Sequence, residues 1–168
     1  MSSDDQLTDS PDSPVKKILV PIDFSPPSQR ALLHALHAAH RAKKHLCIIH
    51  VSKPIPCPPR CTAREYIADQ ELHRQRVKNE ITDLVAKLWT GPFAGTLEPL
   101  ATEGVPSHEI IHAAQRHDID VIVISTYGRA GIKRFFLGST TDHVVRFAPC
   151  SVLVVKKKFK GEMPSLES

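Results

Sequence analysis

Short, continuously apolar runs alternate along the chain with longer segments in which apolar residues recur three and four positions apart. A run without polar alternation is typical of a strand buried on both faces of a parallel sheet. Recurrence at helical spacing predicts helices with one apolar face. The expected strands are 17–21, 45–51, 96–101, 119–124 and 151–155, and the expected helices are 25–44, 62–88, 106–117 and 139–147.

The longest expected helix, 62–88, has an apolar side that should face the core. We expect this inward side to consist of Tyr66, Ile67, Val77, Ile81, Leu84, Val85 and Leu88.

Strands and helices in strict alternation predict a single α/β domain. Its fold class is a five-stranded parallel, doubly wound, Rossmann-like sheet with helices on both faces. A length of 168 residues leaves no room for a second core. Segment 1–15 is rich in Ser, Asp and Pro, and we expect it to be disordered. Segment 157–168 is expected to be a flexible tail, so that the domain spans 16–156.

Charge is distributed unevenly along the chain. The formal net charge is +4, but residues 1–14 carry four aspartates and neither lysine nor arginine, so the remaining residues carry +8. A basic domain is suited to an anionic ligand or partner. Nucleic acid is disfavoured as that partner, because the basic residues are scattered and aromatic residues make up only 5% of the chain.

Hydropathy along the chain disfavours a membrane protein. No apolar run approaches the roughly 18–20 residues that a membrane span needs. The acidic segment 1–5 has no apolar stretch of the kind found in a secretory signal. We therefore expect a cytoplasmic protein with no membrane partner.

The four cysteines do not suggest a disulfide framework at this chain length. Cys47 lies in an apolar run and is interpreted as a small core residue. Cys57 and Cys61 have a spacing that could ligate zinc if two further ligands converged; the alternative is a pair of reduced loop thiols. Histidines at every third position from His34 to His40 drift around a helix, which favours surface roles. We expect no metal site.

The loop after the 119–124 strand contains the residues best suited to bind an anion. Gly128 and Gly138 let the backbone approach a phosphate closely. Ser139 and Thr140 open a helix, where free amides, hydroxyls and the helix dipole favour negative charge. Further positive charge comes from Arg129, Lys133 and Arg134. The loop matches neither Gly-x4-Gly-Lys-Ser/Thr nor Gly-x-Gly-x-x-Gly, so these residues alone indicate an anion-binding loop.

Five segments, taken in order, resemble the universal stress protein family over residues 16–155. They are Ile-Leu-Val-Pro-Ile-Asp-Phe-Ser, Ile-Ile-His-Val, Asp-Val-Ile-Val-Ile-Ser-Thr-Tyr-Gly-Arg, Leu-Gly-Ser-Thr and Ala-Pro-Cys-Ser-Val-Leu-Val-Val. Nucleotide-binding members of that family carry Gly-x2-Gly-x9-Gly-Ser/Thr. Gly128, Gly138 and Ser139 match this motif, and Ser125 stands where the family has its first glycine. Serine could hydrogen-bond a phosphate, or its Cβ could crowd the backbone approach.

The resemblance implies an adenine nucleotide alpha hydrolase-like fold and a set of nucleotide contacts. It implies that Asp23 meets the ribose or adenosine; the alternative is that its carboxylate caps a helix near the Ser28 amide. The resemblance also matches Leu46 to a position whose backbone meets adenine. The full expected set is Pro21, Ile22, Asp23, Leu46, Ser125, Gly128, Arg129, Gly138, Ser139 and Thr140. The ligand implied is ATP, with AMP or ADP as alternatives, and Mg²⁺ would be held mainly by the phosphates.

Three functions remain open on the sequence. The first is a nucleotide-binding stress-response or signalling module, which the resemblance favours. The second is a slow ATP-hydrolysing or phosphate-transferring enzyme, for which Asp23 is the only well-placed carboxylate. The third is a dimeric interaction module without nucleotide, which the serine at position 125 keeps open. The sequence shows no nucleophile elbow and no recognisable triad, so we expect no catalytic residues and at most slow ATP hydrolysis.

The last strand, 151–155, is expected at an edge of the sheet. Its unpaired backbone groups are a template for pairing with a second chain. The resemblance also implies dimers formed through this strand. We therefore expect a homodimer, unless the lysines at 156–158 repel a second copy.

Overall fold

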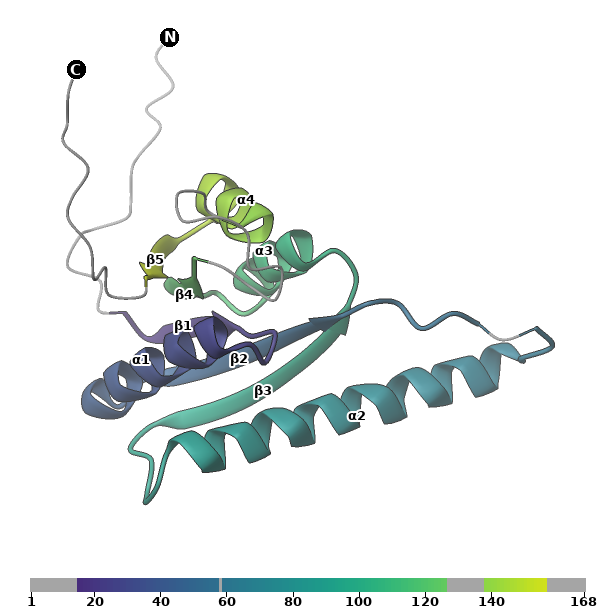
Figure 1. Ribbon diagram of the computed structural model, residues 1–168, viewed down its shortest axis with the longest axis horizontal. Helices are drawn as coiled ribbons and strands as arrows, with labels where there is room; N and C mark the ends of the chain where they lie inside the picture. Colours follow the sequence, from purple (N-terminus) through teal and green to yellow (C-terminus); the bar gives the residue numbers. More distant parts are fainter. Residues whose placement is uncertain (1–14, 58, 127–137, 157–168) are drawn as a thin grey trace, which may run out of the picture.

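The computed structural model describes residues 15–57, 59–126 and 138–156. Along the chain, its elements are β1 (Lys17–Pro21), α1 (Pro26–Ala42), β2 (His45–Ser52), α2 (Ala63–Leu88), β3 (Thr96–Glu103), α3 (Pro106–Arg116), β4 (Val121–Ser125), α4 (Ser139–Phe147) and β5 (Ser151–Val155) (Figure 1). None of the helices in these ranges is long and apolar enough to cross a membrane.

The five strands form one sheet in the order β3-β2-β1-β4-β5, and every neighbouring pair is parallel. The predicted fold class is therefore confirmed. The fourth strand begins two residues later than predicted. The reason is that the chain is still closing α3, since the Ile119 amide donates to the Ala114 carbonyl at 3.0 Å and Asp118 has a φ of 49°.

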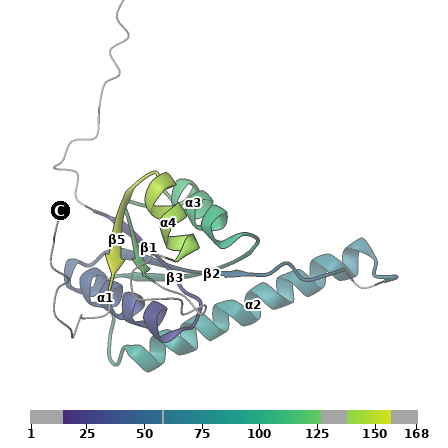
Figure 2. The ribbon, with the colours of Figure 1, turned by 45° about the horizontal axis from the view of Figure 1, so that its top comes forward.

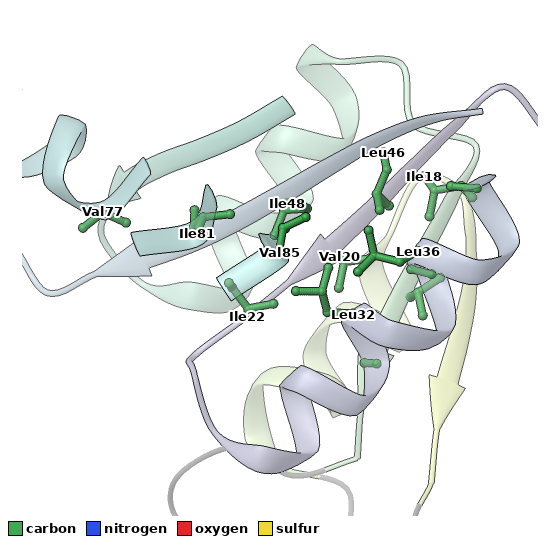
Figure 3. Packing of buried hydrophobic residues seen from close by; sticks show 14 residues of the cluster. Ile18, Val20, Ile22, Leu32, Leu36, Leu46, Ile48, Val77, Ile81 and Val85 are labelled. Carbon is green, nitrogen blue, oxygen red and sulfur yellow. The ribbon is translucent and has the colours of Figure 1, made fainter. Parts of the chain in front are cut away.

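The helices cover the sheet as two layers with a core on each side (Figures 1 and 2). On one face, α1 and α2 pack on alternate residues of β1 and β2, such as Val20 and Ile48 (Figure 3). On the other face, α3 and α4 pack on the intervening residues, such as Leu19 and Ile49. Because successive strand residues point to opposite faces, the buried stretches of both strands, 18–20 in β1 and 46–49 in β2, are continuously apolar, as in other sheets covered on both sides.

Helix α2 is longer than the sheet that it covers, and its first half extends beyond the sheet (Figure 2). Its buried residues are Val77, Ile81 and Val85, all in the second half. Ile67 is 65% exposed, so its predicted inward position is wrong. A capping box stabilises the start of this helix, where no residue is buried. The Thr62 hydroxyl accepts from the Glu65 amide at 3.2 Å, and the Glu65 carboxylate accepts from the Thr62 amide at 2.8 Å.

Candidate functional site

The chain reverses its winding direction between β1 and β4. From β1 it passes through α1 to β2 on one side, whereas from β4 it passes through α4 to β5 on the other. Ligands of open α/β sheets bind at such a switch point, outside the carboxyl ends of the strands. Pro21 ends β1 and Ser125 ends β4, so these two of the expected residues flank this point.

A rigid turn follows β1. The Ile22 amide donates to the Ile49 carbonyl at 2.8 Å, which extends the contact with β2 by one residue. The Asp23 carboxylate then accepts hydrogen bonds from both the amide (3.0 Å) and the hydroxyl of Ser25. Phe24 has a φ of 62°, a left-handed conformation that bulky residues rarely adopt. Strained backbone of this kind is found preferentially at functional sites.

The alternative role considered for Asp23, capping the helix at the Ser28 amide, belongs to another side chain. The Ser25 hydroxyl, as the N-cap of α1, accepts from the Ser28 amide at 3.5 Å. The Asp23 amide in turn donates to the Ser28 hydroxyl at 3.3 Å. Asp23 thus holds the turn that leads into α1, and its carboxylate lies just past the end of β1.

His50 borders the same turn, although the sequence analysis assigned it no role in the site. Its Nδ1 lies 2.8 Å from the Ile22 carbonyl oxygen, and because a carbonyl can only accept, Nδ1 carries the proton. The ring of Phe24 packs on the His50 ring with centroids 4.9 Å apart. The sequence could have indicated this role only through position, because His50 lies near the carboxyl end of β2, the strand beside β1.

Hydrogen bonds tie the start of α4 to the end of β4. Buried Thr141 donates its hydroxyl hydrogen to the Ser125 carbonyl at 2.8 Å. The Gly138 amide donates to the Thr126 carbonyl at 2.9 Å, and the Thr126 amide donates to the Val155 carbonyl at 3.3 Å. The first turn of α4 therefore has a fixed position beside the switch point.

The first turn of α4 offers a setting for negative charge. Gly138 is the N-cap and makes no side-chain capping bond. The amides of Ser139, Thr140 and Thr141 are in the first turn, where a helix supplies no acceptor of its own. Ser139 is exposed and Thr140 partly exposed. Such a turn can bind a phosphate through backbone N–H groups, hydroxyls and the helix dipole.

Not all the expected residues are brought together. Leu46 is fully buried near the amino end of β2, paired with Ile18 (Figure 3). It precedes Ile49 by three residues, or roughly 10 Å of strand. Other expected residues lie outside the described part of the chain, namely Gly128, Arg129, Lys133 and Arg134.

Known proteins with a similar sequence and fold belong to one family. The sequence profile of the universal stress protein family matches residues 14–156. Universal stress protein MJ0531 of Methanocaldococcus jannaschii is 31% identical over 147 residues, which cover 86% of this chain and 84% of that protein. The solved structure of universal stress protein UspA from Lactobacillus plantarum is 30% identical, with a TM-score of 0.63 and coverage of 84% of this chain and 97% of that one.

Two structures at lower identity share the fold and hold nucleotides. One is a universal stress protein in complex with cAMP (22% identity, TM-score 0.61, coverage 84% and 97%). The other is a universal stress protein family protein from Arabidopsis thaliana with AMP bound (21% identity, TM-score 0.55, coverage 90% and 97%). With a family profile that matches nearly the whole domain and a relative above 30% identity, the chain belongs to the universal stress protein family.

Proposed function

We propose that this protein binds an adenine nucleotide between the carboxyl ends of β1 and β4 and acts as a stress-response or signalling module. The observation that carries the proposal is the position of the α4 first turn, which Thr141 and Gly138 hold against the end of β4 at the switch point. In this arrangement the phosphates bind at Gly138–Thr140 and the nucleoside lies toward the turn after β1.

The turn after β1 has the chemistry to recognise a ribose. Asp23 is an acceptor that follows the strand directly, and vicinal hydroxyls are donors that suit a carboxylate. Its bonds to Ser25 hold the carboxylate in one orientation, so little side-chain entropy is lost on binding.

The adenine is expected at the carboxyl end of β2 rather than at Leu46. His50 borders the Asp23 turn, since its ring contacts the Ile22 carbonyl, and Val51 follows it on β2. Leu46 has its backbone inside the sheet between β1 and β3. We therefore move the adenine contact from Leu46 to the backbone at His50–Val51.

ATP is the nucleotide proposed, with Mg²⁺ held mainly by its phosphates. The AMP and cAMP complexes of the two structural neighbours support the adenosine part. The net charge of +8 on the residues after position 14 favours a nucleotide with more phosphates than AMP. Slow hydrolysis is the second candidate and rests on Asp23, a carboxylate that lies just past the end of β1 at the switch point.

The test is binding by the purified protein. Native mass spectrometry of freshly purified protein should detect a bound adenine nucleotide, and calorimetry should give a finite Kd for ATP. Gly138→Val should abolish binding because a branched side chain would occupy the proposed phosphate space. Ala68→Val, on the exposed surface of α2 outside the site, tests whether a valine introduced elsewhere lowers affinity. Equal ATP affinity in the wild type and Gly138→Val would refute the site.

We also propose that the protein forms a homodimer through β5. This strand lies at the edge of the sheet, and Leu153 on it is 55% exposed. A second copy related by a twofold axis would pair antiparallel and close the assembly.

A further inference from the structure

Three metal-ligating side chains meet near the amino ends of β2 and β3, whereas the proposed nucleotide site is at the carboxyl ends of the strands. His45 is the first residue of β2, and Cys47 follows on the same face. Glu98 of β3 is the register partner of Cys47. Strand alternation therefore places all three side chains on the face covered by α3.

The donor atoms are close enough to share one ion. His45 Nε2 lies 2.7 Å from Glu98 Oε2, and the Cys47 thiol donates to the same oxygen at 3.5 Å. All three donor atoms lie within 4.8 Å of one another. Around tetrahedral zinc, with bonds of about 2.0–2.3 Å, ligand atoms are separated by roughly 3.3–3.7 Å. Modest side-chain rotations would bring this set to that spacing.

The three ligands differ in exposure: His45 and Glu98 are open to solvent, and Cys47 lies in the protein interior. The side chains of His45 and Glu98 are 31% and 39% exposed, so an ion can enter from solvent. Cys47 is fully buried, and burial together with Glu98 raises the pKa of its thiol to about 12. A cation that binds here must displace this tightly held proton, so metal affinity should rise with pH.

The charged carboxylate of Glu98 is available to a divalent ion. Burial opposes ionisation of Glu98, yet its bonds with His45 and Cys47 lower its pKa, so the carboxylate is charged. His117 Nδ1 lies 4.0 Å from Glu98 Oε1 and can support that carboxylate. Lys17, a neighbouring cation, donates its Nζ hydrogen to the His117 carbonyl at 2.8 Å.

We propose that His45, Cys47 and Glu98 form a binding site for one zinc ion, with water as the fourth ligand. One imidazole, one thiolate and one carboxylate are a borderline-soft set that suits Zn²⁺, whereas Mg²⁺ and Ca²⁺ prefer oxygen ligands alone. Farther along the same face of β2 and β3, the paired residues are apolar, as with Ile49 opposite Leu100. The polar side chains of this face are therefore concentrated at the proposed metal site. The site does not depend on the proposed nucleotide binding.

Cobalt provides a direct probe, because a thiolate bound to Co²⁺ gives a charge-transfer absorption band. The starting protein should carry Cys57→Ser and Cys61→Ser, which remove the two loop thiols without touching the cluster. We expect one Co²⁺ per chain, a thiolate band, and loss of the band when Zn²⁺ is added. Cys47→Ala should abolish the band, whereas Cys150→Ala, at another thiol of the same core, should preserve it.

Zn²⁺ calorimetry on the partly exposed ligands keeps the test decisive if Cys47→Ala does not fold. His45→Gln and Glu98→Gln should each weaken Zn²⁺ binding at least about tenfold, in line with the loss of a metal-site group. Failure to bind one metal ion, a band that persists in Cys47→Ala, or unchanged affinity in both ligand variants would overturn the proposal. ATP affinity should be unaffected in all of them, so failure here and failure of the nucleotide site are separable.

Discussion

Asp120 ties the start of the central strand to the loop before β4. Its carboxylate accepts from the amides of Lys16 and Lys17 at 2.7 and 2.8 Å. Burial opposes ionisation of Asp120, but these two donors outweigh it and lower the pKa of the carboxyl group. Since the folded pKa is below the unfolded value of about 3.9, the stabilisation is present above that pH and is lost as the pH falls through the folded pKa.

Asp120→Asn should therefore destabilise the protein at neutral pH by about 1 kcal/mol, as expected for one weakened hydrogen-bond pair at an exposed site. The comparison is urea unfolding at pH 7 and again well below pH ~3.9. At the acidic pH the two proteins should approach equal stability, because the wild-type carboxyl group is then protonated too. A difference that stays constant between the two pH values would contradict this role.

Asp23 can be tested apart from the turn that it holds. Asp23→Asn keeps an oxygen that can accept from Ser25 but removes the charge, so thermal stability should stay close to wild type. ATP affinity should fall about tenfold, which corresponds to losing roughly 1.4 kcal/mol of binding free energy. Asp83→Asn, on the exposed surface of α2, is the matched control and should bind as the wild type does. If Asp23→Asn bound ATP as tightly as the wild type, the proposed contact between Asp23 and the ribose would be wrong.

At the scale of elements, the two halves of α2 should contribute unequally to stability. Ile81 is fully buried, and Ile81→Ala should cost about 2–5 kcal/mol in the free energy of unfolding. Ile67 is exposed, and Ile67→Ala should stay within about 0.5 kcal/mol of wild type. Urea denaturation of the matched pair gives both values. Comparable losses would mean that the first half of the helix is covered by something other than the sheet.

The pattern of apolar residues predicted the elements well because both faces of the sheet are covered, so the buried stretch of each central strand is continuously apolar. It could not predict where α2 leaves the sheet, since Ile67 has the same helical spacing whether or not a strand lies beneath it. The His45–Cys47–Glu98 cluster was not predicted either. Its third member comes from β3, and only the register of the two strands places Glu98 opposite Cys47.

At the scale of the whole molecule, the backbone of β5 allows a selective test of the proposed dimer. The Val155 carbonyl accepts from Thr126, so Val155 directs its backbone groups toward the interior of the sheet. Successive strand residues alternate, and the Val154 N–H therefore points to the open edge. Proline is tolerated where a strand N–H faces outward.

Val154→Pro should therefore remove a donor needed by a second copy while sparing the ladder to β4. We expect light scattering to show a dimer for the wild type and for Val154→Ala, and a folded monomer for Val154→Pro. A wild-type monomer at micromolar concentration would refute the proposal, as would a folded Val154→Pro variant that stays dimeric.

The central place of β1 also constrains how the chain can be made. Lys17 meets Asp120 across 103 positions of sequence, so one side of the first strand has no native neighbour until most of the polypeptide has left the ribosome. Domains generally fold as units, so this one cannot complete its sheet before β4 has emerged. The nascent β1–β2–β3 half would then present an uncovered apolar strand edge, and only the arrival of β4 closes it. Completion late in translation makes that interval the period of greatest exposure to aggregation.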